Sequence, residues 1–154
     1  MKQNIIAILI LTFCISYNVL SSKEANTSKL LEPINYYSYP ITKIVDGDTI
    51  EIEVDFLPIE LGKYIKLRIN SIDSPELHGQ CLDEVDKAKK AKKFLNDLIK
   101  SGRDVKIVLT GRDKYFRLLG DVIVDGKPVS VTMVETNHAV LYSGATKQSW
   151  CNTK

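Results

Sequence analysis

The stretch ITKIVDGDTIEIEV, residues 41–54, decides the fold, because it contains two apolar runs that flank a short acidic turn. Ile50, Ile52 and Val54 alternate with glutamates, which is the period of a strand with one face in a core. The dipeptide Asp46-Gly47 tolerates the backbone angles that a tight hairpin turn requires. The stretch therefore predicts a β-hairpin with carboxylates at its turn.

Three further strands are indicated downstream of the hairpin. Residues 64–69 alternate, so their apolar side chains share one face and Arg68 lies on the other, away from the core. Strand character returns at residues 105–109 and again at residues 118–124, where Asp125-Gly126 closes the run. Together with the hairpin, these segments predict five strands.

Two helices are expected between and after these strands. Residues 83–100 carry an apolar side chain at every third or fourth position, and Ser101-Gly102 ends the run, which predicts an amphipathic helix. The lysines on its other faces are typical of a solvated surface. A shorter helical segment is expected from Ser130, as its N-cap, to about Asn137.

The order of these elements favours an α+β fold that is mainly β. Three antiparallel strands, a helix, two strands and a short helix match a closed five-stranded barrel of the OB type with an inserted amphipathic helix and a short C-terminal helical segment. Closure of the barrel would remove exposed sheet edges. With 154 residues and 44% hydrophobic content, the chain is large enough for one such domain.

The N-terminal residues have the composition of an export signal. Lys2 precedes an apolar run at residues 5–17, which is shorter than the roughly 20 residues of a spanning helix. Small residues follow at VLSS, residues 19–22, where a signal peptidase could cleave. We expect a signal peptide at residues 1–22, a flexible leader at 23–39, one domain at 40–154, and export to the periplasm or beyond. An uncleaved N-terminal membrane anchor is the alternative.

Net charge does not identify a partner. The formal net charge is +2, and it is one lower if Lys2 leaves with the signal. Binding of a polyanion must therefore be argued from local features.

The cysteines agree with export. Cys14 would leave with the signal, so the mature chain would keep Cys81 and Cys151, an even pair in an oxidising compartment. We expect these two to form a disulfide. Two unrelated buried thiols are the alternative.

Three polar motifs indicate phosphodiester hydrolysis: VDGDT at residues 45–49, IDSPE at 72–76 and DKYFR at 113–117. With the strand before the second motif they supply three carboxylates and two guanidiniums: Asp48, Asp73, Glu76, Arg68 and Arg117. Carboxylates suit a hard cation such as calcium, and guanidiniums pair two phosphate oxygens at once. Each motif alone is typical of an ordinary turn or surface residue, so the prediction depends on their joint occurrence.

Two other classes of protein were compared with this hypothesis. A noncatalytic OB module would bind single-stranded nucleic acid by stacking bases on Tyr115, Phe116 or Tyr142, with the helix lysines attracting phosphates. A secreted calcium-binding interaction domain would explain the aspartates alone. Neither class requires the arginines together with Glu76, so a hydrolase is favoured.

The chain resembles the staphylococcal nuclease (thermonuclease) family from about Ile44 to Tyr142. The resemblance is carried by VDGDT, LRINSIDSPE, AKKAKKFL, DKYFRLLG, DGKPVSVTMVETNHAV and the following LY. It implies an OB-fold barrel that hydrolyses DNA and RNA with Ca²⁺ and leaves 3′-phosphorylated products. A monomer with no stable protein partner is the default.

The resemblance also implies roles for nine residues. The catalytic residues implied are Arg68, Glu76 and Arg117; those of the metal site are Asp48, Asp73 and, through its carbonyl, Ser74; those that hold substrate are Lys114, Tyr115 and Tyr142. Ser74 replaces a frequent threonine, which is harmless if only the carbonyl binds metal. Phe116 replaces a frequent glycine, and because bulky residues disfavour positive φ, we expect the loop that carries Arg117 to take a different path.

Overall fold

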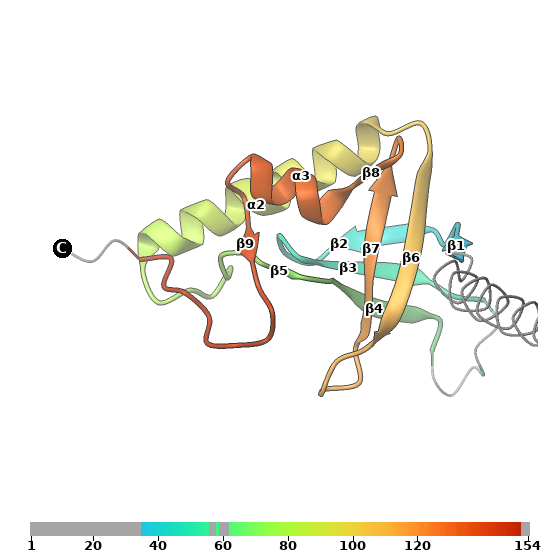
Figure 1. The fold of residues 1–154 in the computed structure, drawn as a ribbon, viewed down its shortest axis with the longest axis horizontal. Helices are drawn as coiled ribbons and strands as arrows, with labels where there is room; N and C mark the ends of the chain where they lie inside the picture. Colours follow the sequence, from blue (N-terminus) through green and yellow to red (C-terminus); the bar gives the residue numbers. More distant parts are fainter. Residues whose placement is uncertain (1–34, 56–57, 59–61, 152–154) are drawn as a thin grey trace, which may run out of the picture. The chain divides into compact units, whose positions relative to one another are not determined.

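The computed structural model describes residues 35–55, 58 and 62–151 of the chain. This part is mostly β-sheet with two helices, α2 (Leu82–Ser101) and α3 (Val129–Glu135), as Figure 1 shows. Neither helix has the length and apolar character needed to cross a membrane. The predicted signal peptide and residues 23–34 of the predicted leader lie outside the described residues.

The main sheet has six strands in one hydrogen-bonded path, with a short seventh beside it. Their order is β1 (Tyr36–Tyr37), β6 (Val105–Arg112), β7 (Leu118–Val124), β4 (Tyr64–Ile69), β3 (Thr49–Glu53) and β2 (Ile41–Ile44), and β8 (Lys127–Pro128) pairs with β7. Neighbours are antiparallel except β4 and β7. A second, two-stranded sheet joins β5 (Ile72–Asp73) to β9 (Val140–Leu141).

The closed five-stranded barrel that the sequence predicted is not formed by these ladders. The path ends at β1 and β2, and no ladder joins these two strands in the part of the chain that the structure describes. β1 and β2 are at opposite ends of this path, yet only residues 38–40 connect them, so the two edges of the sheet lie close together at this point. Pro40 has no N–H to donate to a ladder, although its carbonyl accepts from Glu53 at 2.9 Å.

Most of the predicted strands and the long helix are confirmed. β2 and β3 form the hairpin, with Ile44 opposite Ile50 across the acidic turn. β4 and β7 have the predicted bounds, α2 extends one residue further at each end, and β6 continues to Arg112. The sequence missed β1, which lies within the segment expected to be a flexible leader.

The predicted N-cap of the short helix is wrong. Pro128 is the N-cap and Ser130 lies inside α3. The Ser130 hydroxyl donates to Asp121 on β7 instead, and its amide donates to the same carboxylate at 3.2 Å. This cross-link to the sheet replaces the local cap, because the carboxylate satisfies an N–H of the first helical turn that has no partner within the helix.

The core lies between the sheet and the two helices. Its fully buried members come from strands and helices alike: Ile50, Ile52, Leu67, Ile69, Ile107, Val122, Ala91, Leu95 and Met133. The hairpin turn packs closely against this core at Gly47, where a Cβ would lie 2.8 Å from the Cβ of Ser74 and 2.9 Å from that of Ala91. Only glycine permits this approach, which brings the aspartates of the turn next to β5.

Candidate active site

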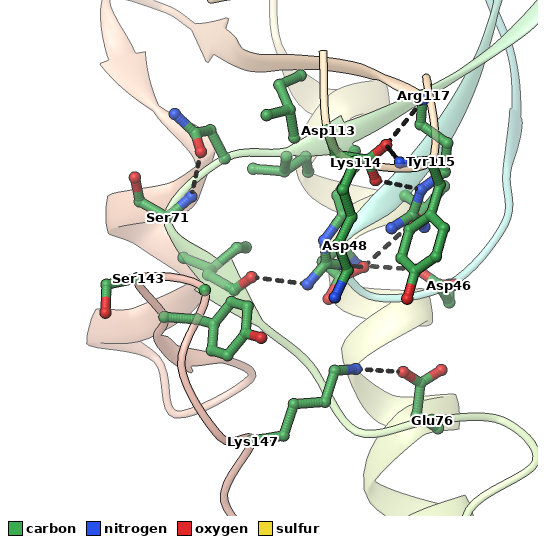
Figure 2. A pocket seen from close by; sticks show the side chains of 18 residues that line it. Asp46, Asp48, Ser71, Glu76, Asp113, Lys114, Tyr115, Arg117, Ser143 and Lys147 are labelled. Carbon is green, nitrogen blue, oxygen red and sulfur yellow. Dashed lines mark hydrogen bonds and ion pairs between the residues drawn. The ribbon is translucent and has the colours of Figure 1, made fainter. Parts of the chain in front are cut away.

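A pocket of about 750 Å³ opens on one face of the sheet and gathers most of the predicted site residues. Seven of them line it: Asp48, Arg68, Glu76, Lys114, Tyr115, Arg117 and Tyr142. Figure 2 shows the loop between β6 and β7 on one side and Glu76 with Lys147 on the other, with Asp48 between them. Asp73 and Ser74 do not line the pocket and are both buried.

Two buried carboxylates joined by one guanidinium form what we call the floor: Asp48, Arg68 and Asp73. Asp48 is 3% exposed and Asp73 is 1% exposed. Arg68 donates from Nη1 to Asp48 Oδ1 and from Nη2 to Asp73 Oδ1 at 3.4 Å. Nη2 also donates to the Ile72 carbonyl at 3.1 Å, and the Ser74 amide donates to Asp48 Oδ2 at 3.0 Å. The backbone around β5 therefore fixes the direction of these groups.

The arginine of the floor stays charged although it is largely buried. Its side chain is 12% exposed and lies on the face of β4 opposite the core, as the alternation predicted. Burial alone would lower the pKa of Arg68, but the contact with Asp48 and the field of Asp73 outweigh burial and raise it. A permanent positive charge thus separates the two carboxylates.

Asp46 adds a further carboxyl beside the floor, and the sequence prediction did not assign it a role. It lines the pocket, and its Oδ1 accepts from the Asp48 amide at 3.1 Å. Burial, followed by repulsion from Asp48, raises the pKa of Asp46 to about 6. This corner of the pocket therefore concentrates acidic groups in little solvent.

The other predicted residues come from loops and form what we call the rim: Glu76, Lys114, Tyr115, Arg117 and Tyr142. Asp113 organises the loop between β6 and β7, since it accepts from the amides of Tyr115 at 2.8 Å and Arg117 at 2.9 Å. It also accepts from Arg117 Nε at 2.7 Å. The second guanidinium is thus oriented by its own loop and is more exposed than the first.

Phe116 does not avoid the conformation that its bulk disfavours. Its φ is 62°, in the left-handed region, and its side chain is 79% exposed. Strain of this kind persists where the surrounding structure imposes it. Here Arg112 donates to the Phe116 carbonyl at 2.8 Å, and the Phe116 amide donates to the Asp113 carbonyl at 3.0 Å.

Two tyrosines of the rim are positioned differently. Tyr115 is 68% exposed, with Lys114 Nζ 5.1 Å and Arg117 Cζ 5.8 Å from its ring centroid. Tyr142 is held more firmly, since its amide donates to the Ser71 carbonyl and its hydroxyl to the Ala145 carbonyl, both at 2.8 Å.

Comparison with known proteins identifies the domain. A family model described as "Staphylococcal nuclease homologue" matches residues 66–153, more than half of the chain. The chain belongs to the staphylococcal nuclease family. This membership agrees with the resemblance that the motifs indicated.

Several proteins are related to this staphylococcal nuclease domain. An uncharacterized endonuclease of Haemophilus influenzae is 30% identical over 137 residues, which cover 88% of this chain and 64% of the relative. The endonuclease YhcR of Bacillus subtilis is 30% identical over 69% of this chain and 9% of its own length. The succinoglycan biosynthesis protein ExoI of Rhizobium meliloti is 31% identical over 63% of this chain and 48% of its own length. The chain spans less than two thirds of each of these relatives.

The donor set of this staphylococcal nuclease domain fits a hard divalent cation. Asp48 and Asp73 offer only oxygen, are buried, and contact the same guanidinium. A second cluster in the described residues, Cys81, Glu84 and Cys151, is unsuited to metal because its two sulfurs are bonded to each other.

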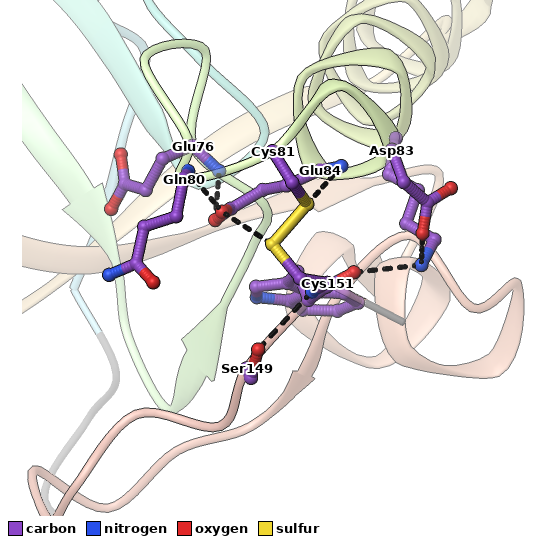
Figure 3. Close-up of a disulfide and its surroundings, with 9 residues drawn as sticks. Glu76, Gln80, Cys81, Asp83, Glu84, Ser149 and Cys151 are labelled. Carbon is purple, nitrogen blue, oxygen red and sulfur yellow. Dashed lines mark hydrogen bonds and ion pairs between the residues drawn. A yellow bond between two sulfur atoms is a disulfide. The ribbon is translucent and has the colours of Figure 1, made fainter. Parts of the chain in front are cut away.

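The predicted disulfide is present and supports the loop that carries Glu76 (Figure 3). Cys81 caps α2, its sulfur accepting from the Glu84 amide at 3.4 Å. Glu84, which is buried, accepts from the amides of Glu76 at 3.3 Å and Gln80 at 2.8 Å. With a sequence separation of 70 between the cysteines, the bridge contributes on the order of 4 kcal/mol in the chain-entropy model.

Sequence reasoning also missed Lys147, which lines the pocket. Its Nζ lies 2.7 Å from Glu76 Oε1 and 2.8 Å from Asp73 Oδ1. Partial burial would lower the pKa of Lys147, but its hydrogen bonds to Asp73 and Glu76 outweigh burial and raise it. The predicted bridge was the available signal, because Lys147 is four residues from Cys151 and Glu76 five from Cys81.

Proposed function

We propose that this protein is a calcium-dependent nuclease that hydrolyses phosphodiester bonds of DNA and RNA and favours single strands. One observation carries the proposal: a single pocket presents the carboxylate of Glu76 together with two guanidiniums, above a floor of buried carboxylates. Family membership and relatives named endonucleases support the same conclusion.

In the proposed reaction Glu76 acts as the general base. Its carboxylate orients a water molecule and accepts a proton from it as the water oxygen attacks phosphorus in line. The bond from phosphorus to the 5′ oxygen breaks, and the 3′ side keeps the phosphate. Glu76 suits this role because its side chain is about half exposed at the pocket, where water and substrate both reach it.

The two arginines stabilise the charge that develops on phosphorus oxygens. Arg68 approaches from the floor and Arg117 from the rim, so their guanidiniums can contact different oxygens of one phosphate. Asp48, Asp73 and the Ser74 carbonyl would hold calcium, which would supply further charge stabilisation when bound. Lys114, Tyr115 and Tyr142 hold the substrate's phosphate and nucleotide.

We also propose that the main sheet is a partly open barrel of the OB type. The support is its strand order and the way β1 and β2 bring its two edges into one segment. Such barrels bind nucleic acids across one face, which suits the pocket.

Export remains part of the proposal. The apolar N-terminal run and the Cys81–Cys151 bridge support a signal peptide at residues 1–22, a leader at 23–39 and an oxidising destination. A membrane anchor is the alternative, and the exported nuclease is expected to act as a monomer.

The test is cleavage of single-stranded DNA and RNA by the purified exported protein. We expect calcium-dependent degradation that stops when the metal is chelated. Glu76→Gln should lose cleavage while keeping its fold. Glu135→Gln, a change on α3 outside the pocket, should keep cleavage. Binding of single strands without cleavage across a series of divalent metals would instead establish a noncatalytic binding module.

A further inference from the structure

Lys147 occupies the space between two carboxylates to which the proposed function gives different tasks. Its ammonium nitrogen contacts Asp73, a proposed metal ligand, at 2.8 Å and Glu76, the proposed base, at 2.7 Å. Figure 2 shows the side chain reaching into the pocket from the C-terminal segment toward Glu76. The side chain is 46% exposed, so it can move without opening the core.

The segment that carries Lys147, which we call the C-terminal strap (residues 143–151), is attached at both ends. Before it, the Tyr142 amide donates to the Ser71 carbonyl at 2.8 Å. At its far end Cys151 is bonded to Cys81, and Lys87 Nζ donates to the Trp150 carbonyl at 2.9 Å. The backbone of the strap is therefore held beside the floor, and the long side chain of Lys147 provides the freedom to move.

Both carboxylate oxygens of Asp73 face nitrogen donors in this arrangement. Its Oδ1 accepts from Arg68 at 3.4 Å and from Lys147 at 2.8 Å, and its Oδ2 accepts from Trp150 Nε1 at 3.5 Å. A divalent cation needs a carboxylate oxygen that faces it, and an ammonium on that oxygen also repels the cation. Calcium and Lys147 thus compete for Asp73.

We propose that Lys147 is the internal counter-ion of the metal site: it must leave Asp73 before a divalent cation binds there, and it thereby sets the cation affinity. The inference rests on the proposed function in that Asp73 is taken as a metal ligand. When calcium is scarce, the Lys147 ammonium would neutralise the acidic pocket and hold Glu76 in place. Because affinity at oxygen sites follows the charge of the site, removal of this positive charge should strengthen binding.

Calcium binding without nucleic acid tests this directly. Isothermal titration calorimetry gives the dissociation constant, and Trp150 reports locally, since it is the chain's single tryptophan and lies beside Asp73. We expect Lys147→Met to lower the calcium dissociation constant about fivefold or more, because a unit charge at contact distance is worth that much even in water. Lys147→Arg, which keeps the charge, should stay near the wild-type value.

A matched control separates local competition from general charge. Lys114→Met removes a lysine of the same pocket, one whose ammonium lies over the Tyr115 ring. It should change the calcium dissociation constant much less than Lys147→Met. Asp73→Asn should abolish the Trp150 response in both the wild type and the Lys147→Met protein.

The proposal is overturned if Lys147→Met binds calcium no more tightly than the wild type, or if Lys114→Met has the same effect. It is also overturned if neither the wild type nor Lys147→Met binds calcium at millimolar concentration. These outcomes differ from failure of the proposed function, which is the absence of cleavage by the wild type in any divalent metal. If the wild type cuts nucleic acid but Lys147→Met binds calcium with unchanged affinity, only the counter-ion proposal is refuted.

Discussion

The floor and the rim of the pocket hold the same kinds of charged group in opposite physical settings. In the floor, Asp48 is buried and Arg68 largely so, and both are fixed by the backbone around β5. In the rim, Arg117 is oriented by Asp113 of its own loop and remains partly exposed. The difference teaches that a change in the floor should cost both stability and catalysis, whereas a change in the rim should cost catalysis or binding alone.

The largest effect is expected at Glu76, a rim residue with a chemical task. Glu76→Gln removes the proton acceptor and should lower the cleavage rate by about 100-fold to 10,000-fold. Because the side chain is about half exposed, the thermal unfolding midpoint should stay near that of the wild type. Single-turnover cleavage measures the rate and differential scanning calorimetry the unfolding midpoint. A large loss of stability would show that Glu76 behaves like a floor residue.

The two arginines give the sharpest contrast. Arg68→Met leaves two buried carboxylates without their guanidinium and should lower the free energy of unfolding by about 3 kcal/mol. Arg117→Met breaks a partly exposed ion pair and should cost under about 1 kcal/mol.

Both arginine variants should lose cleavage by a similar factor, about 100-fold or more, because each removes a donor to the same phosphate. Urea unfolding gives the stabilities and single-turnover kinetics the rates. Equal stability losses in the two variants would show that the floor and the rim do not differ as described.

Phe116 tests whether backbone strain in the loop that carries Arg117 contributes to substrate binding. Phe116→Gly relieves the positive φ at a site where glycine is at ease, so the free energy of unfolding should not fall. Single-stranded DNA affinity should fall about fivefold or more, since an exposed ring on the loop between β6 and β7 is suited to stacking a base. Phe116→Ala should lose affinity for single-stranded DNA by the same factor but keep the strained positive φ. Unchanged affinity in both variants would show that the ring is not part of the binding surface.

The smallest effect is expected away from the pocket, at the stack of His138 on Phe94, whose ring centroids are 4.2 Å apart. Burial lowers the pKa of His138 below its ordinary value of about 6.5. The unfolded chain therefore takes up the proton more readily. The stability that depends on neutral His138 is fully present above the unfolded pKa and declines as the pH falls below it.

Replacing this histidine should flatten that decline. His138→Phe should show a smaller loss of stability between about pH 7.5 and pH 5.5 than the wild type. His78→Gln, a change of the chain's other histidine, serves as the control. Urea unfolding at several pH values measures both slopes, and cleavage by either variant at neutral pH should be unaffected. An identical slope in His138→Phe and the wild type would contradict the assignment.

Much of the fold could be predicted because its signals are local. The alternation at residues 50–54 and 64–69 fixed both the strands and the face on which Arg68 lies. Strand β1 could not be predicted, because a pair of tyrosines next to Ser38 and Pro40 has no alternation and is stabilised by a distant partner, β6. The predicted N-cap at Ser130 was wrong because this residue, too, has a distant partner: its hydroxyl donates to Asp121 on β7.

The candidate site divides in the same way. Asp48 and Glu76 could be located because each belongs to a short acidic motif. Lys147 belongs to no motif and contacts Glu76 across 71 residues, so only the predicted Cys81–Cys151 bridge indicated that it lies near Glu76. The role of such a residue is visible only after the disulfide and the strap are placed in space.

The tight packing at Gly47 has a consequence for how this sequence can vary. Even a methyl group there would press on Ser74 and Ala91, and the displacement would move the aspartate that follows out of reach of its guanidinium. In a randomised library selected for cleavage, position 47 should return glycine alone, whereas position 135, exposed on α3 outside the pocket, should accept many residues. The evolutionary constraint on this turn thus comes from a missing side chain.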